Sequence, residues 1–129
     1  MRSLWRSRWL HFGLWLALIF GLSSIPDLKP PGPSVSGTDK IFHAGEYALL
    51  GALLGRALGL RRDGIWLGAA LGLGIGILDE LHQGRVPGRE MDPFDALADM
   101  VGAALGCCAW VWLTRRRQAP KEATRNERS

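Results

Sequence analysis

Apolar residues fall in four runs along the chain, separated by short polar segments. The longest run without Asp, Glu, Lys or Arg covers the 18 residues 9–26. Residues 64–78 and 100–114 form two such runs of 15 residues each, and residues 41–60 are mostly apolar. A bilayer-spanning helix needs roughly 20 mainly apolar residues, and no stretch alternates as a half-buried strand does. The pattern predicts an all-α polytopic membrane protein with a bundle of four transmembrane helices.

The polar segments set the expected helix ends. We expect four helices, over about residues 9–23, 39–60, 64–83 and 92–114. Pro26 ends the first helix because it disfavours a helical residue before it, while Asp92 caps the fourth and Pro93 suits its first turn. Residues 28–38 are interpreted as an extended Pro-, Gly- and Ser-rich linker and residues 118–129 as a disordered tail. The resulting division is an N-terminal segment, a helical domain and a basic tail over residues 1–8, 9–114 and 115–129.

Small residues recur inside the apolar runs. GALLG at residues 51–55 and GLGIG at residues 72–76 favour close helix packing in lipid, and no strand precedes them as a phosphate-binding loop would require. Cys107 and Cys108 are adjacent within an apolar run, which excludes a disulfide framework and favours packing. The first run also resembles the core of a cleaved signal peptide, but it is long for one and no A-x-A site follows.

Basic residues define the expected orientation. The net charge is +4, yet Lys and Arg cluster at the ends of apolar runs and are not interleaved with aromatic residues, which argues against a nucleic-acid partner. Of the 16 basic residues, 12 precede the first helix, follow the fourth, or lie around the turn between the second and third. The positive-inside rule then places both termini in the cytoplasm and the other end of the bundle on the extracytoplasmic side.

Ionisable residues gather at that other end, most densely in LDELHQGRVPGREMDPFDALADM at residues 78–100. Three helices contribute them: Asp39, Lys40, His43, Glu46 and Tyr47, then Asp79, Glu80, His82 and Gln83, then Asp92, Asp95 and Asp99. Their spacings place Asp39, His43 and Tyr47 on one helix face, with Glu46 flanking it, and Asp92, Asp95 and Asp99 on another. Asp79 and His82 are three residues apart, as are Glu80 and Gln83. Asp99 lies about two turns inside the fourth helix, where a charge is costly unless it is paired. By depth, its expected partners are His43, His82 and Arg89.

The sequence resembles the VanZ-like family of small bacterial membrane proteins. Four stretches carry the resemblance: LSSIP at 22–26, DKIFHAGEYALLGALL at 39–54, DELHQGRVPGRE at 79–90 and DALADMVGAALG at 95–106. The family's ordered polar motifs map onto Asp39, Lys40, His43 and Tyr47, then Asp79, Glu80, Gln83 and Arg89, then Asp95 and Asp99. Two positions depart from the family pattern, Ala44 in place of Phe and Asp99 in place of the common Asn. The resemblance implies a membrane protein, linked to resistance to the glycopeptide teicoplanin, with a polar site but no assigned reaction or cofactor.

Three interpretations of the polar residues remain open. In the first, the site binds or processes an anionic or glycosylated envelope lipid or lipid-linked precursor, with Arg85, Arg89 and Lys40 holding the anion. The catalytic candidates are then Asp79, Glu80 and His43, and the ligand-binding candidates are Asp39, Lys40, Tyr47, Gln83, Arg85, Arg89, Asp95 and Asp99. In the second, imidazole and carboxylate groups bind a metal, with His43, Glu46 and His82 as candidate ligands beside the acids. In the third, the protein is a structural or partner-binding subunit, and a homo-oligomer fits any of the three.

Overall fold

The computed structural model describes residues 2–29 and 37–126, and it describes side chains over residues 5–29 and 37–117. All regular secondary structure in this part of the chain is helical. They are α1 (Arg2–Ser23), α2 (Thr38–Leu58), the short 3-10 helix η1 (Arg62–Gly64), α3 (Ile65–Gln83) and α4 (Pro93–Asn126). The predicted all-α fold with four long helices is confirmed over these residues.

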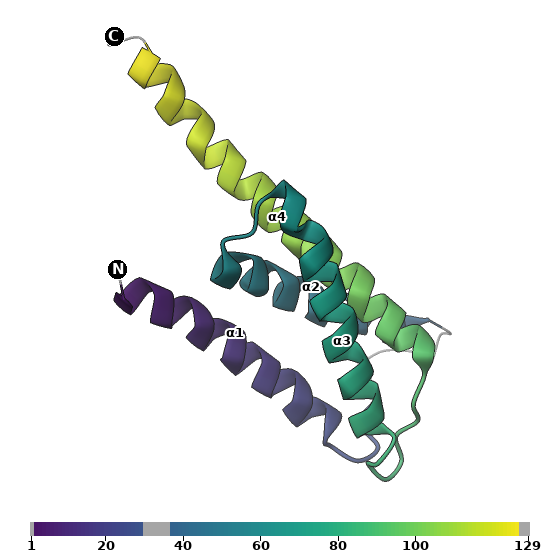
Figure 1. The fold of residues 1–129 in the computed structure, drawn as a ribbon. Coiled ribbons are helices and arrows are strands. Elements are labelled where there is room, and N and C mark those ends of the chain that lie inside the picture. Colours follow the sequence, from purple (N-terminus) through teal and green to yellow (C-terminus); the bar gives the residue numbers. More distant parts are fainter. Residues whose placement is uncertain (1, 30–36, 127–129) are drawn as a thin grey trace.

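Helix α4 is the centre of the arrangement. It packs along both α2 and α3, while α1 packs against α2 and α3 (Figure 1). The C-terminal part of α4 extends beyond the other helices. The end of α1, the start of α2 and the α3–α4 loop gather at one end of the molecule, opposite the two chain termini. The ends of the helices that carry the polar residues therefore converge.

Local sequence explains where the helices end. α1 ends at Ser23, just before Ile25-Pro26, as expected. At the start of α4, the backbone N–H of Phe94 donates to Asp92 Oδ1 at 2.9 Å, which confirms the predicted cap. α2 stops at Leu58, two residues before the expected end, because Gly59 adopts a left-handed conformation (φ 65°).

Two helices are longer than the hydrophobic pattern predicts. α1 begins at Arg2 and not near residue 9, and α4 continues to Asn126 past its expected end before Arg115. Arg, Gln, Lys, Glu and Ala are good helix formers, so a helix can continue after its apolar run has ended. Most of the segment predicted as a disordered tail is therefore helical. The central part of the predicted Pro-rich linker (30–36) and the end of the tail (127–129) lie outside the described residues.

Small residues bring the helix backbones into direct contact. A Cβ atom at Gly51 would lie 2.1 Å from the Ala103 carbonyl oxygen, and one at Gly106 would lie 1.9 Å from the Ala48 carbonyl oxygen. On α3, a Cβ atom at Gly72 would lie 2.2 Å from the Cβ of Ala103. The predicted role of the GALLG and GLGIG segments in close packing is confirmed.

The distribution of polar and apolar side chains suits a lipid environment. Asp79 and Asp99 are among the largest fully buried side chains, whereas Trp66, Ile41 and Phe94 are 82%, 73% and 65% exposed. Two helical stretches, Arg62–Gln83 and Pro93–Arg117, are long and apolar enough to cross a membrane. α1 and α2 do not meet that standard. In α2 the reason is compositional, since the helix includes Asp39, Lys40, Glu46 and Arg56 within 21 residues.

Candidate functional site

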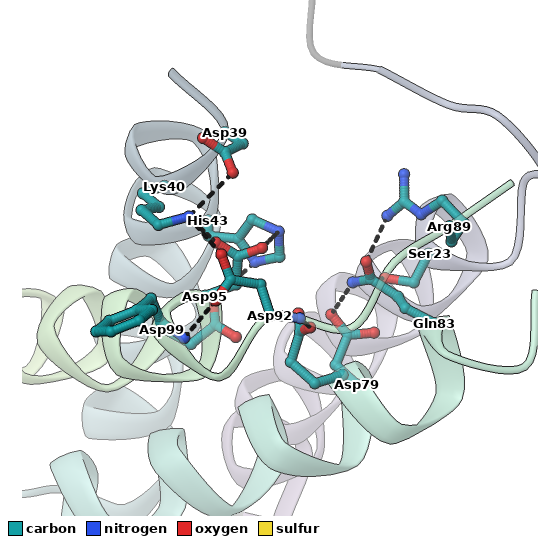
Figure 2. A network of polar contacts seen from close by, with 12 residues as sticks. Ser23, Asp39, Lys40, His43, Asp79, Gln83, Arg89, Asp92, Asp95 and Asp99 are labelled. Atoms are coloured by element: carbon teal, nitrogen blue, oxygen red, sulfur yellow. Dashed lines mark hydrogen bonds and ion pairs between the residues drawn. The ribbon is translucent and has the colours of Figure 1, made fainter. Parts of the chain in front are cut away.

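The polar side chains at the converging helix ends form two adjacent clusters (Figure 2). The Lys40 cluster joins the start of α2 to the start of α4 and consists of Asp39, Lys40, His43, Asp92, Asp95 and Asp99. The Gln83 cluster joins the end of α1, the end of α3 and the α3–α4 loop and consists of Ser23, Asp79, Gln83 and Arg89. Glu80 lies between them, because its Oε2 accepts a hydrogen bond from the backbone N–H of Asp92 at 2.8 Å.

Lys40 forms ion pairs with three carboxylates at the rim of the first cluster. Its Nζ lies 3.1 Å from Asp39 Oδ2, 2.8 Å from Asp92 Oδ2 and 3.1 Å from Asp95 Oδ1. The hydrogen bond from Lys40, reinforced by the backbone N–H of Phe94, lowers the pKa of Asp92 below its ordinary value. The ammonium group therefore supplies the positive charge that this group of acids requires.

His43 lies one turn deeper along α2 and contacts two carboxylates of α4. Its Nδ1 is 3.0 Å from Asp99 Oδ1, and its Nε2 is 3.7 Å from Asp95 Oδ2. Asp99 is fully buried. A glycine on α3 makes room for it, since a Cβ atom at Gly76 would lie 2.7 Å from Asp99 Oδ2. Helices α2, α3 and α4 thus jointly shape the environment of Asp99.

The Gln83 cluster is a chain of hydrogen bonds from α1 to the loop. Gln83 Nε2 donates to Asp79 Oδ2 at 3.1 Å and to Ser23 Oγ at 3.2 Å. Gln83 Oε1 accepts from Arg89 Nη2 at 2.8 Å, and Arg89 Nη1 donates to the Leu28 carbonyl at 2.6 Å. Arg89 is therefore held by neutral acceptors, and no carboxylate of the described residues forms an ion pair with it.

Four buried polar atoms at this end have no hydrogen-bond partner among the described residues. They are Asp79 Oδ1, Glu80 Oε1, Asp99 Oδ2 and the Tyr47 hydroxyl. An unpartnered buried polar group costs about 1–3 kcal/mol, and most buried polar atoms in native proteins are paired. The concentration of such atoms beside His43 distinguishes this region from a fully satisfied structural network.

The structure corrects two of the three partners predicted for Asp99. His43 is confirmed, but His82 pairs instead with the hydroxyl of Ser24, through Nε2 at 2.8 Å. Arg89 bonds to Gln83 and Leu28. Both residues come from the end of α3 or the loop after it, where they lie closer to the end of α1 than to α4. Spacing along a helix gives the shared face of its residues but not the neighbour that this face meets.

Three other predicted site residues differ in how deeply they are buried. Tyr47 is fully buried, Glu46 is half-buried and Arg85 is exposed. Across the described residues, the only hydrogen bond of Arg85 outside regular helix pairing is from its backbone N–H to the His82 carbonyl. Sequence reasoning did not single out Ser23 and Ser24 as members of the site. The available signal was the presence of two polar residues at the end of an apolar run, within the LSSIP stretch.

Three groups of side chains place metal-ligating atoms within 4.8 Å of one another among the residues described. The groups are His43, Glu80 and Asp95; His43, Asp79 and Asp99; and Asp39, Asp92 and Asp95. Most of the imidazole and carboxylate ligands considered from sequence belong to such groups, namely His43, Asp79, Glu80, Asp95 and Asp99. His82 and Glu46 belong to none of them. Each group brings atoms of metal-ligating type close together, and two of the groups set His43 beside buried carboxylates.

Comparison with known proteins assigns the chain to a family. A family model described as VanZ/LLP1 matches residues 6–114, which is most of the chain. No curated protein and no solved structure shows significant similarity to it. The matched region contains α1 from Arg6 onward, α2, α3, α4 as far as Thr114 and every residue of both polar clusters. The resemblance seen in the polar motifs is therefore confirmed, and the chain belongs to the VanZ/LLP1 family.

Proposed function

We propose that the protein binds the anionic headgroup of an envelope lipid or lipid-linked precursor at the polar end of its helical domain. In this proposal the four helices cross the bacterial inner membrane, both termini are cytoplasmic, and the site faces the extracytoplasmic side. The observation that carries the proposal is the uncompensated charge of Arg89. The family resemblance to a teicoplanin-resistance factor supports an envelope ligand.

Arg89 has acidic groups close by and yet is not paired with one. The buried acids Asp79 and Glu80 lie on the neighbouring end of α3, but among the described residues the guanidinium group hydrogen-bonds only to the Leu28 carbonyl and Gln83 Oε1. A guanidinium has five N–H donors, and these two contacts orient the group without cancelling its charge. Such a group suits bidentate recognition of a phosphate or carboxylate.

The loop that carries Arg89 is fixed against the segment that follows α1. Gly88 adopts a positive φ of 73°, and a Cβ atom there would lie 1.9 Å from Asp27 Oδ1. Arg85 is exposed four residues earlier on the same loop. The pair Arg85 and Arg89 therefore offers one exposed and one pre-oriented cation to an anionic ligand. Lys40 contributes less than the sequence suggests, because three carboxylates already neutralise it.

His43, Asp79 and Glu80 are the groups able to move protons behind this loop. Asp79 and Glu80 are 1% and 3% exposed, and each has one oxygen without a partner. Burial of carboxyl groups beside an imidazole is a common arrangement for acid–base chemistry. We therefore assign them the chemical step if the bound lipid is processed, with Arg89 and Arg85 restricted to binding.

The test is lipid retention by the full chain. Wild type and the double variant Arg85→Gln/Arg89→Gln are reconstituted with mixed phosphatidylcholine and phosphatidylglycerol, in the presence of a chelator, and retained lipids are identified by native mass spectrometry. The control is Arg61→Gln/Arg62→Gln, which removes the same charge from exposed residues at the opposite end. We expect wild type and control to retain phosphatidylglycerol preferentially and the loop variant to lose this preference.

Equal retention by the two double variants would overturn the proposal, because anionic lipid would then be attracted by net charge alone. Loss of folding in the loop variant is assessed by circular dichroism. The single variant Arg85→Gln keeps the test informative in that case, since this exposed side chain has no described contact to lose.

A further inference from the structure

We propose that His43, Glu80 and Asp95 form a binding site for one divalent metal ion of the Zn²⁺ or Mn²⁺ type, and that Asp99 positions His43 for this role. One imidazole and two carboxylates, with room for water, form a ligand set used for these metals. The three residues come from α2, α3 and α4, so the site assembles only when these helices pack together. This inference is independent of headgroup binding by Arg85 and Arg89.

In the neighbouring acidic group, the side chain of Lys40 already provides the cation. Asp39, Asp92 and Asp95 also place ligand atoms within 4.8 Å of one another, and Lys40 Nζ contacts all three at 2.8–3.1 Å. No Lys or Arg side chain among the described residues pairs with Glu80 or Asp99. Of the two proposed carboxylate ligands, Asp95 therefore shares Lys40 with the outer acids, whereas Glu80 has no Lys or Arg partner among the described residues.

The hydrogen bond to Asp99 determines which nitrogen of His43 is available. Asp99 is fully buried and its Oδ1 lies 3.0 Å from His43 Nδ1, so the ring donates its Nδ1 proton there. In the neutral ring, Nε2 then carries the lone pair. A carboxylate on the far nitrogen of a metal-binding histidine fixes the tautomer and the ring orientation in this way.

The free nitrogen of His43 faces acids rather than donors. Nε2 lies 3.7 Å from Asp95 Oδ2, and the group formed with Glu80 keeps all ligand atoms within 4.8 Å. Two ligand atoms at ~2.1 Å from a tetrahedral zinc are about 3.4 Å apart. This is close to the 3.7 Å between His43 Nε2 and Asp95 Oδ2. A lone pair opposite a carboxylate is repulsive unless a cation lies between them, and a metal ion provides that cation.

Glu80 supplies the second, independent indication of a ligand. Its side chain is 3% exposed, its Oε2 accepts the backbone N–H of Asp92, and its Oε1 has no partner. The hydrogen bond to Oε2 fixes the carboxylate and leaves Oε1 free to coordinate. The His43 and Asp95 side chains are 13% and 10% exposed, which leaves a route for an ion to enter from the end of the bundle.

A proton on His43 is the alternative cation. It would satisfy Nε2 and the charge of Asp95, but it would leave Glu80 Oε1 without a partner. The two occupants differ in what they predict. A metal ion binds with micromolar or tighter affinity to lipid-free protein and is displaced as the pH falls, whereas a protonated ring gives no metal binding near neutral pH.

The experiment titrates the purified full chain in detergent, without added lipid, with Co²⁺, Zn²⁺ and Mn²⁺ alone. The Co²⁺ absorption spectrum reports nitrogen and oxygen ligation, and mass spectrometry of retained metal reports stoichiometry. We expect about one ion per chain and displacement of Co²⁺ by Zn²⁺. Loss of a residue that only orients a metal ligand weakens binding about 10–100-fold, so Glu80→Gln and Asp95→Asn, which remove ligands, should weaken it at least as much.

Glu90→Gln is the matched control, because Glu90 is an exposed acid on the α3–α4 loop that belongs to none of the three groups, and the change should leave the metal affinity unchanged. Absence of binding by wild type between pH 6 and 8, or equal binding by wild type, Glu80→Gln and Asp95→Asn, would overturn the proposal. The Co²⁺ spectrum is recorded on folded protein. A variant that is only destabilised therefore still shows the wild-type spectrum if the residue is not a ligand.

Discussion

Helices α2 and α4 meet in two different ways along their length. In the half nearer the chain termini, Gly51 and Gly106 bring backbone against backbone, with no space for even one added carbon. In the other half, Lys40 and His43 face Asp95 and Asp99 across the same interface. The first half is closely packed and apolar, and the second keeps buried oxygen atoms without partners.

The difference indicates that the two halves serve different purposes. Close packing of small residues holds helices together in lipid, where apolar side chains gain nothing from avoiding water. Buried charges contribute little net stability, since their desolvation offsets their attraction. Close packing of small residues already holds these helices together, so the buried charges are not needed for folding. We therefore assign the polar half to binding.

The largest expected effect comes from filling the packed half. Gly51→Ala places a Cβ atom 2.1 Å from the Ala103 carbonyl oxygen. We expect the free energy of unfolding to fall by about 3 kcal/mol, the upper range for overpacking. Gly45→Ala is the control on the same helix, because nothing lies within 4 Å of its Cβ position. It should raise stability by about 0.5–1 kcal/mol through helix propensity. Thermal unfolding in detergent measures both, and equal effects would contradict the assigned role of the packed half.

A smaller effect of opposite sign is expected in the polar half. Asp99→Asn removes a buried charge but keeps an oxygen that can accept from His43 Nδ1. It also adds an N–H donor where Asp99 Oδ2 now has no partner. We expect the free energy of unfolding to stay unchanged or rise by about 1 kcal/mol, and metal affinity to fall about 10–100-fold. Chemical unfolding beside metal titration tests this, and a loss of several kcal/mol with affinity intact would show the polar half to be structural.

The smallest effect concerns the exposed rim of the polar half. Lys40 lowers the folded-state pKa of Asp92 below its ordinary value of 3.8. The ionised carboxylate therefore stabilises the fold fully above that ordinary value, and the contribution is lost as pH falls through the folded-state pKa. Asp92→Asn should lower the melting temperature slightly at neutral pH, where the ion pair contributes fully, and the melting temperatures of the two proteins should converge as the pH falls. Added salt should diminish the difference between the variants, since this pair is partly exposed. A difference that grows with falling pH would contradict the sign of the shift.

Much of this organisation follows from the sequence. Four apolar runs suffice to predict four helices because a helix in lipid requires a continuous apolar stretch, and Asp92-Pro93 predicts the start of α4 to the residue. The polar ends of the runs predict that Lys40, Glu80 and Asp95 lie at one end of the molecule. The extent of α1 and α4 could not be predicted in this way, because charged residues that form good helices continue them outside the apolar runs.

Only the tertiary structure decided which side chains meet. Residue spacing fixes the face of a helix, but the rotation and register of one helix against another depend on close contacts such as Gly51 against Ala103, which no local pattern reveals. That register places His43, and not His82, beside Asp99, and it leaves Arg89 bonded to Gln83 rather than to an acid. The sequence thus determined which groups share one end of the bundle. Helix packing determined their partners, because hydrogen bonds and metal ligation require atoms placed to within a few tenths of an ångström.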